Sequence, residues 1–203
     1  MTKPLSIFLG IDPGTGRTGW GVIKKNDAGG TNPTIEYVAH GCIVTEKEDT
    51  MPERLLVLHK ELEGIIYQYK PHCLIVEQLF FGRNIRTAMS VGQARGVVML
   101  SAANNSLPLL EYTSISVKHY LSGSGKTEKK DLQVIVRRLL SQTKRKLSFN
   151  TKDKGFDDSA DALAIAIHHA LKLDGHIFNH PEPKKKINKK KIKKISKEKP
   201  RKK

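Results

Sequence analysis

Two short apolar runs in this chain each end in a carboxylate. The run from Ile7 to Ile11 is followed by Asp12, and the run from Leu74 to Val76 is followed by Glu77. Continuous apolar runs of this length are typical of strands covered on both faces. An ionised carboxylate that leaves water costs several kcal/mol unless a cation or hydrogen-bond donors compensate it, so acids at the ends of buried strands indicate a bound cation.

The order of the patterns along the chain predicts an α/β fold. Three strands come first, and the turn and loop between them favour an antiparallel meander: 5–11, 18–24 and 34–45. Helices and strands then alternate: helix 50–69, strand 73–76, helix 84–101, strand 107–112, helix 127–140 and helix 157–173. These elements predict a mixed five-stranded sheet, with three antiparallel and two parallel strands, flanked by helices.

Positive charge is concentrated at the C-terminal end. The 203 residues carry a formal net charge of +16, yet residues 184–203 hold thirteen Lys or Arg against Glu198 alone, which leaves only +4 for the rest. We predict one domain over residues 1–176 and a Lys-rich disordered tail over 177–203. The tail would either tether the protein to DNA in a salt-sensitive way or remain simply solvated. The basic stretch 142–155 is predicted to be a mobile loop.

Cysteine usage and hydropathy bound the cellular context. Cys42 and Cys73 lie far apart without a CxxC pattern, so neither a disulfide framework nor a zinc knuckle is indicated. No apolar stretch approaches the roughly 20 residues that cross a bilayer, and no signal peptide is evident. We therefore expect a cytoplasmic protein without a membrane partner. The pair His168-His169 is interpreted as one exposed and one packed histidine rather than a metal site.

A third group of acids opens the last predicted helix. Asp158 and Asp161 are three residues apart and share a helix face, whereas Asp157 is expected to be the N-cap. Taken singly, each acid could be a cap, a surface charge or the partner of an arginine. Four acids that meet at one point would instead repel each other, which favours bound divalent cations, and hard carboxylate oxygens suit magnesium. A pair of ions can bind the attacking water and the leaving 3′ oxygen of an in-line displacement at phosphorus, so phosphodiester hydrolysis is the expected reaction.

Five motifs of the chain resemble those of the bacterial RuvC Holliday-junction resolvases. In chain order they are Gly10-Ile11-Asp12-Pro13-Gly14, Thr18-Gly19-Trp20-Gly21-Val22-Ile23, Val76-Glu77-Gln78-Leu79-Phe80, Gly92-Gln93-Ala94-Arg95-Gly96 and Ala160-Asp161-Ala162-Leu163-Ala164-Ile165-Ala166. The resemblance covers residues 5 to 172. It implies an RNase H-like sheet, a homodimer, two Mg²⁺ ions per site with Mn²⁺ as a substitute, and symmetric nicking of four-way DNA junctions in recombination and repair. A branch-migration helicase as partner and association with the bacterial nucleoid are further implications.

The resemblance also assigns roles to individual residues. It implies that Asp12, Glu77, Asp158 and Asp161 are the catalytic and metal-binding acids, that Lys118 and Lys129 are catalytic lysines, and that Phe80 inserts into the junction. From the residues alone, both lysines could equally be solvated charges, and Lys130 is as eligible as Lys129. Lys126 lies in a glycine loop that opens a helix, so it could contact a DNA phosphate or belong to a plain connector. Candidate DNA contacts are therefore Phe80, Lys118, Lys126, Lys129 and Lys130.

Three other functions compete with junction resolution. An RNase H-like nuclease could act on RNA or on another branched nucleic acid. An actin-like ATPase would need two such domains, and 203 residues supply one. A junction-binding protein without chemistry is disfavoured by the intact set of acids. The helix that carries Gly92 and Gly96 is either a dimer contact or closely packed inside one protomer.

Overall fold

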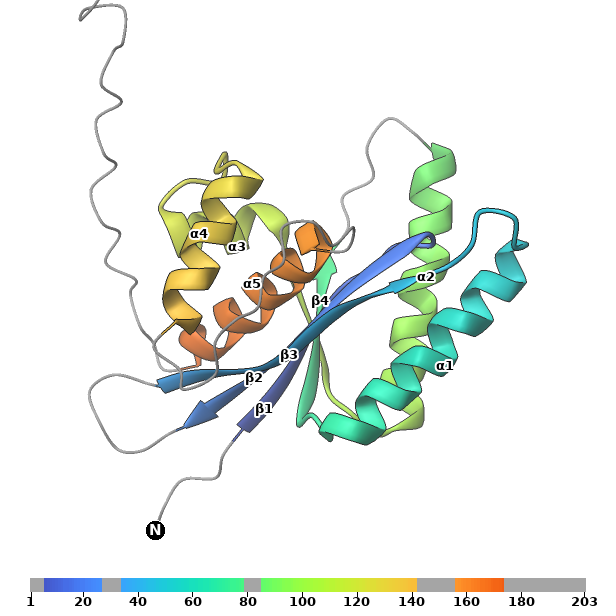
Figure 1. The fold of residues 1–203 in the computed structure, drawn as a ribbon, viewed down its shortest axis with the longest axis horizontal. Coiled ribbons are helices and arrows are strands. Elements are labelled where there is room, and N and C mark those ends of the chain that lie inside the picture. The colour runs from blue at the N-terminus through green and yellow to red at the C-terminus, as the bar shows by residue number, and fades with distance from the viewer. Residues whose placement is uncertain (1–5, 27–33, 79–84, 142–155, 174–203) are drawn as a thin grey trace, which may run out of the picture.

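A computed structural model describes residues 6–26, 34–78, 85–141 and 156–173 of the chain. Its elements follow one another in this order: β1 (Ser6–Asp12), β2 (Arg17–Asn26), β3 (Thr34–Val44), α1 (Met51–Tyr69), β4 (Cys73–Gln78), α2 (Ile85–Asn104), β5 (Leu109–Thr113), α3 (Ser114–Ser122), α4 (Lys129–Leu140) and α5 (Phe156–Lys172). Figure 1 shows a twisted sheet between two groups of helices. Phe80, the stretch 142–155 and the tail 177–203 lie outside the described residues, so the predictions about them and the domain boundary at 176 stay predictions.

The five strands form one mixed sheet in the order β3-β2-β1-β4-β5. β1 pairs antiparallel with β2, and β2 with β3, whereas β4 runs parallel to both β1 and β5. The predicted architecture is thus confirmed. Helix α3 was not predicted: it begins where the Thr113 side chain accepts a hydrogen bond from the Ser116 N–H at 3.0 Å, and ends at Gly123, which has φ 81°.

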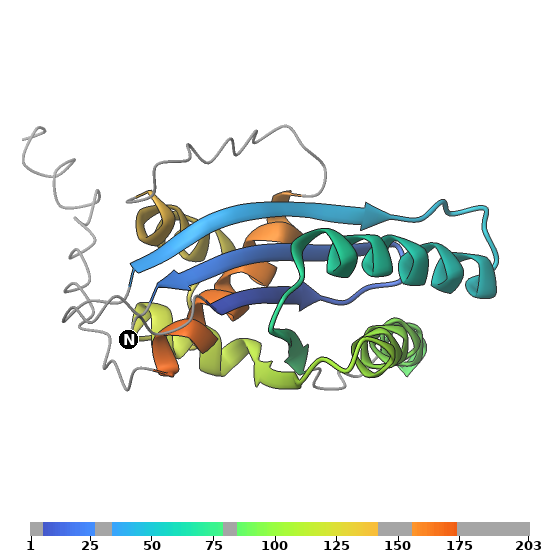
Figure 2. The ribbon, with the colours of Figure 1, turned by 90° about the horizontal axis from the view of Figure 1, so that it is seen from below.

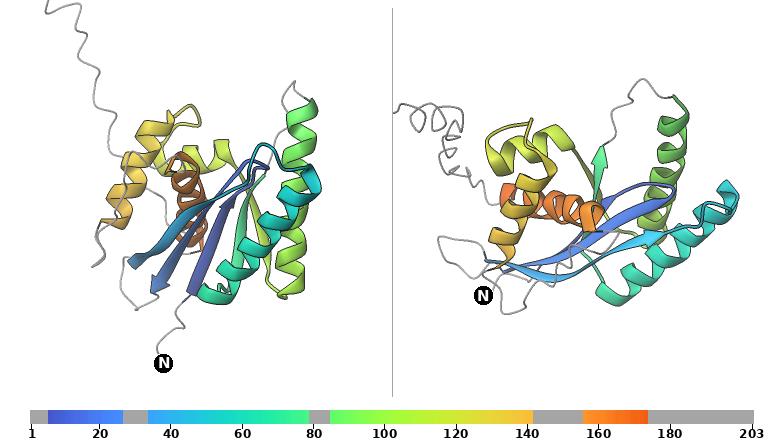
Figure 3. Two further views of the ribbon diagram at one scale, coloured as in Figure 1. Left: turned by 45° about the vertical axis from the view of Figure 1, so that its right-hand side comes forward. Right: turned by 45° about the horizontal axis from the view of Figure 1, so that its top comes forward.

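Helices cover both faces of the sheet. α1 and α2 lie on one face, and α3, α4 and α5 lie on the other (Figures 2 and 3). Because side chains alternate along a strand, β1 sends Leu9 and Ile11 into the core beneath α1 and α2, and Phe8 into the core beneath α5. Asp12 follows the same alternation, and its side chain therefore belongs to the face that α5 covers.

Glycines in the first two strands allow α5 to lie unusually close to the sheet. A Cβ atom at Gly10 would stand 2.1 Å from the carbonyl oxygen of Ala162, and one at Gly21 would stand 2.6 Å from the Leu163 side chain. Only the absence of a side chain permits this approach. The Ser159 hydroxyl also donates to the Gly41 carbonyl at 2.8 Å, which ties the start of α5 to β3. The acids of α5 are thereby placed next to the strand ends.

The histidine pair of α5 differs from the prediction. His168 and His169 are both buried, at 3% and 5% exposure, so the expectation that one is exposed was wrong. The hydroxyl of Tyr112 lies 3.0 Å from His169 Nδ1, and the rings of Tyr112 and Tyr120 pack edge-on against His168. Burial lowers the pKa of His168 to about 4 and also lowers that of His169. Both rings are therefore neutral core groups at pH 7.

Two further expectations from the sequence are corrected. α5 begins at Phe156, which puts Asp157 inside its first turn rather than at the N-cap. A Cβ atom at Gly92 or Gly96 would meet no atom within 4 Å, so close packing of α2 at these positions inside the protomer is excluded for the described residues. The dimer alternative for this helix stays a prediction. Within the described ranges, no helix has the length and apolar character needed to span a membrane.

Candidate active site

Asp12 and Glu77 meet at the carboxyl ends of adjacent parallel strands. Ile11 of β1 is the register partner of Val76 of β4, so the acid that follows each of them projects from the same edge of the sheet. The two carboxyl groups share a hydrogen bond. Burial is the largest cause that raises the pKa of Asp12, and the charges of Glu77, Asp161 and Asp158 add to it, which brings the value to about 8. A carboxyl group in this state gains most from a bound cation.

The two acids of α5 complete the group from above the sheet. The charges of Asp158 and Asp161 both raise the pKa of Asp12. The four acids predicted from the sequence therefore form one electrostatic cluster. Burial raises the pKa of Asp161, against the opposing effect of Lys129, whose Nζ lies 3.1 Å from Asp161 Oδ2. Burial disfavours the charged form of Lys129, but Asp161, Asp12 and Asp158 together outweigh this effect and raise the pKa of Lys129. Lys129 is thus held charged beside the acids.

The other predicted lysines are placed differently. Lys118 lies on α3, and its charge lowers the pKa of Asp161, which puts it in the surroundings of the acids. Lys126, Lys129 and Lys130 are all exposed, and of the two consecutive lysines it is Lys129 that contacts Asp161. The structure therefore separates Lys129 from Lys130, which the residues alone could not do, because the orientation of α4 decides which of two consecutive lysines reaches Asp161.

Arg17, at the first position of β2, is a site residue that the sequence reasoning missed. Its Nε donates a hydrogen bond to Asp158 Oδ2 at 2.9 Å, and the guanidinium lies beside the Cys42 thiol. A signal was present: in the hairpin, Asp12 pairs with Gly19, so any residue at the start of β2 stands close to Asp12. The partner of Arg17, however, lies 141 residues away in sequence.

The carboxylate oxygens of the four acids suit a hard divalent cation, although they are not arranged as a complete coordination sphere. In the part of the chain that the structure describes, no three side chains of His, Cys, Asp or Glu stand close enough together to hold a metal ion. Arg17 and Lys129 each bind one oxygen of an α5 acid. All four candidate ligands are carboxylates, and a Mg²⁺ ion would relieve the repulsion that Asp12 meets from Glu77 when it ionises. The residues therefore fit the predicted metal.

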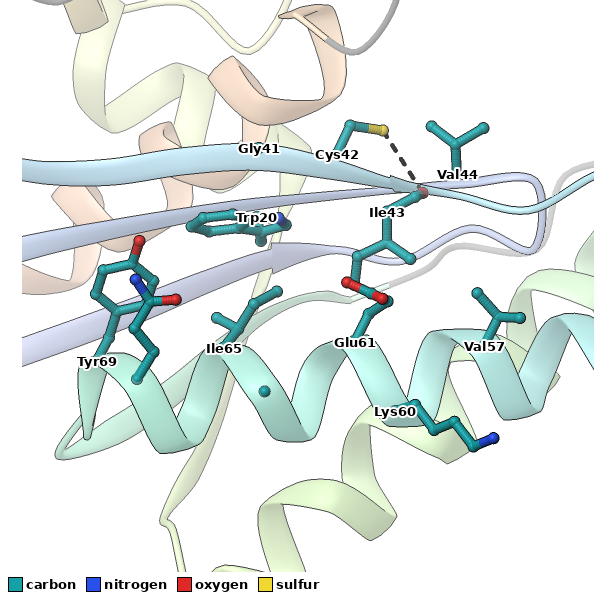
Figure 4. A pocket seen from close by; sticks show the side chains of 12 residues that line it. Trp20, Gly41, Cys42, Ile43, Val44, Val57, Lys60, Glu61, Ile65 and Tyr69 are labelled. Carbon is teal, nitrogen blue, oxygen red and sulfur yellow. Dashed lines mark hydrogen bonds between the residues drawn. The ribbon is translucent and has the colours of Figure 1, made fainter.

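A pocket of about 620 Å³ lies on the opposite face of the sheet, between β3 and α1 (Figure 4). Trp20, Ile43, Ile65 and Tyr69 contribute to its walls. In Figure 4 the side chain of Cys42 points away from Trp20, toward the other face of the sheet. None of the four acids lines this pocket, so it is separate from the candidate active site.

Comparisons with known proteins agree with this architecture. The family model of the crossover junction endodeoxyribonuclease RuvC matches residues 8–169. The RuvC of Desulfitobacterium hafniense (strain DSM 10664 / DCB-2) is 46% identical over 164 residues, which cover 81% of this chain and 92% of the relative. The RuvC of Roseiflexus sp. (strain RS-1) is 42% identical over 161 residues, which cover 79% of this chain and 88% of the relative.

Solved structures extend the agreement to the fold. The structure of T. thermophilus RuvC in complex with Holliday junction substrate matches with a TM-score of 0.70 at 28% identity and covers 83% of this chain and 94% of that one. The yeast mitochondrial Holliday junction resolvase shares the fold, with a TM-score of 0.62 at 16% identity over 87% of this chain and 83% of that one. Sheet order, helix layers and strand-end acids together define an RNase H-like nuclease. The chain belongs to the RuvC family of crossover junction endodeoxyribonucleases.

Proposed function

We propose that this protein is a magnesium-dependent endonuclease that resolves four-way DNA junctions in recombination and repair. The observation that carries the proposal is the convergence of Asp12, Glu77, Asp158 and Asp161 into one electrostatic cluster. The RuvC relatives and the T. thermophilus RuvC bound to a Holliday junction support the choice of substrate. They do not favour the alternative of a nuclease that acts on RNA or another branched nucleic acid.

In the proposed mechanism the four acids would hold two Mg²⁺ ions, or Mn²⁺ in their place. When bound, the ions supply an activated water and charge stabilisation at the leaving 3′ oxygen. Asp12 retains a proton beside Glu77 in the metal-free protein, with a pKa of about 8, and it would release this proton to solvent on becoming a ligand, because a nearby cation lowers the pKa of a carboxyl group. Lys129 stands 3.1 Å from Asp161 and offsets charge that develops on the phosphorus oxygens, with Lys118 as a second positive group nearby.

The contacts to DNA outside the acid cluster are assigned from the resemblance to the RuvC family. Phe80 is proposed as the side chain inserted into the junction, and Lys126 and Lys130 as exposed contacts to DNA phosphates. The Lys-rich tail 177–203 would add nonspecific attraction to DNA. The bacterial origin of the relatives is consistent with a cytoplasmic location. Nucleoid association and a branch-migration helicase partner are proposed from the family resemblance alone.

A test of the proposed function compares three labelled substrates. We expect purified protein to nick a four-way junction symmetrically in the presence of Mg²⁺ or Mn²⁺, and to leave linear duplex and RNA–DNA hybrid uncut, because two equivalent sites of a dimer match a two-fold symmetric junction. Chelation of the metal should remove the nicking. Equal cleavage of the hybrid would favour the RNase H-like alternative, and junction binding without any nicking would contradict an enzyme.

We also propose a homodimer that forms through α2. Its exposed face carries Met89, Met99 and Leu100, at 65%, 43% and 55% exposure, and the open positions Gly92 and Gly96. Positions 89, 92 and 96 are followed at the same spacing of three or four by the pair 99 and 100, so these residues form one stripe on the side of the helix away from the buried Val98. Exposed apolar side chains beside glycines suit a helix that packs on a symmetric copy.

Leu100→Asp is expected to weaken the dimer at least tenfold, because a charge without a partner would be buried in the apolar contact. Analytical ultracentrifugation over a concentration series measures the change. Val134→Asp is the matched control, since Val134 is 63% exposed on α4 and lies away from the stripe. An unchanged dimer in Leu100→Asp, or an equal loss in the control, would move the interface to another surface.

A further inference from the structure

The turn that precedes β2 holds Arg17 in a fixed position. The Thr18 hydroxyl donates to the Gly14 carbonyl at 2.7 Å and accepts from the Gly14 N–H at 3.2 Å. Thr45 ties the same turn to the end of β3, because its N–H donates to the Gly16 carbonyl at 3.1 Å and its hydroxyl donates to the Thr15 carbonyl at 2.6 Å. These hydrogen bonds therefore fix the position of the backbone at Arg17.

The partner of Arg17 is fixed as firmly. A Cβ atom at Gly19 would stand 2.3 Å from the backbone of Asp158, so the first turn of α5 presses directly on β2. The side chains of Arg17 and Asp158 are 34% and 25% exposed, and Nε and Oδ2 are 2.9 Å apart. Two positioned and partly shielded groups form a stronger ion pair than two flexible surface side chains.

Positive charge is distributed unevenly over the four acids. Asp161 is paired with Lys129, and Asp158 is paired with Arg17. No cation of the described residues is paired in the same way with Asp12 or Glu77, which have each other. A divalent ion that approaches the Asp12–Glu77 pair therefore meets uncompensated carboxyl groups. An ion that approaches Asp158 meets an oxygen already bound by a guanidinium and a fixed positive charge beside it.

The environment of the guanidinium limits how well it is bound. Arg17 Nη2 is buried and has no hydrogen-bond partner among the described residues. Its neighbour is the Cys42 thiol, and sulfur is a weak acceptor. A buried donor without a partner reduces the net gain from the Arg17–Asp158 contact, so this contact can compete with an ion without being a fully satisfied pair.

We propose that Arg17 is a positioning residue that acts through Asp158 and lowers the affinity of that side of the site for divalent cations. The ion held by Asp158 is then the weaker of the two, and Arg17 sets the cation concentration at which the site fills. This inference rests on the proposed function, because it takes Asp158 as a metal ligand. An arginine with a purely structural role would leave the affinity for metal unchanged.

The test is a titration of the metal-free full-length protein with Mn²⁺, followed by calorimetry and by the electron paramagnetic resonance of free Mn²⁺. Arg17→Gln and Arg17→Met remove the charge, and we expect each to tighten the weaker Mn²⁺ binding on the order of tenfold. Arg17→Lys keeps the charge and should restore affinity close to that of the wild type. Thermal melts establish which variants fold, and the two neutral replacements guard against a folding defect in one of them.

Asp158→Asn tests whether Arg17 acts through Asp158. In that background, Arg17→Gln should no longer change Mn²⁺ binding, because the group through which Arg17 acts has been removed. A persistent effect would overturn the role assigned to Asp158. Unchanged or weaker Mn²⁺ binding in both neutral Arg17 variants would overturn the inference itself.

Junction cleavage separates this inference from the proposed function. For Arg17→Gln, the Mg²⁺ concentration that gives half-maximal cleavage should fall, in line with the tighter Mn²⁺ binding. Wild-type protein that cleaves junctions while Arg17 has no effect on metal would leave the function standing and remove the inference. If the Arg17 variants bind Mn²⁺ more tightly but the wild-type protein never cleaves a junction, the inference about Arg17 would stand and the proposed function would fall.

Discussion

Asp12→Asn is expected to abolish junction cleavage and, without metal, to make the protein more stable. Asparagine keeps the shape of the side chain but lacks the charge that binds a cation, which removes several kcal/mol of transition-state stabilisation and lowers the rate roughly a thousandfold or more. The gain in stability follows from the burial of Asp12 and its repulsion by Glu77, Asp161 and Asp158. Rate of nicking and melting temperature are the two measurements.

The pH dependence of this stability has a definite sign. The pKa of Asp12 is about 8 in the folded protein and 3.8 when unperturbed, so the folded state keeps a proton that the unfolded chain releases. Metal-free wild type should therefore lose stability as pH rises from about 4 to 8, and Asp12→Asn should lose less over this window. At pH 7.5 we expect the variant to be more stable on the order of 2–4 kcal/mol. Mg²⁺ should stabilise the wild type and so reduce the difference in stability between it and the variant.

Asp131→Asn is the matched control for Asp12→Asn. Asp131 lies in the first turn of α4, is exposed and is not one of the four clustered acids. Its replacement should change neither the rate of nicking nor the response of stability to Mg²⁺. Nicking by Asp12→Asn at the wild-type rate would remove Asp12 from the active site, and equal pH profiles of wild type and variant would contradict the repulsion described for the cluster.

Gly10→Ala is expected to cost about 3 kcal/mol or more of folding free energy and to inactivate the enzyme. A Cβ atom at this position would stand 2.1 Å from the Ala162 carbonyl oxygen and 3.1 Å from the Ala166 side chain, so α5 has to move away from β1. Asp161 precedes Ala162 and would move with it. Chemical denaturation measures the loss of stability, and the junction assay measures the loss of cleavage.

Gly64→Ala is the control for this prediction. Gly64 lies inside α1, and a Cβ atom there would meet nothing within 4 Å. The same substitution should stabilise the protein by about 0.5–1 kcal/mol through helix propensity and leave cleavage intact. Equal stabilities of Gly10→Ala and wild type would show that α5 is not held by its close approach to β1.

The strand-end acids were predictable because they depend on local patterns. Asp12 and Glu77 each follow an apolar run, and a parallel pairing of two such strands brings their ends together without further information. The helix spacing of Asp158 and Asp161 is equally local. What the sequence alone did not give is the position of α5 over the sheet, which depends on Gly10, Gly19 and Gly21 acting together across two strands.

Other features required tertiary information. The segment that forms α3 has β-branched and hydroxyl residues with weak helix propensity, and its helix depends on the Thr113 cap and on burial of Val117 and Leu121. The contact between Arg17 and Asp158 arises only because α5 crosses β2. The two buried histidines became neutral core groups because Tyr112 and Tyr120 enclose them, and neither tyrosine is near them in sequence.

The four acids come from positions 12, 77, 158 and 161, so the proposed catalytic group is spread over about three quarters of the chain. A chain still being synthesised, or one cut ahead of residue 156, contains Asp12 and Glu77 but cannot complete the cluster. If these acids are the catalytic group that we propose, cleavage has to wait until the last helix, α5, has been synthesised and has folded onto the sheet.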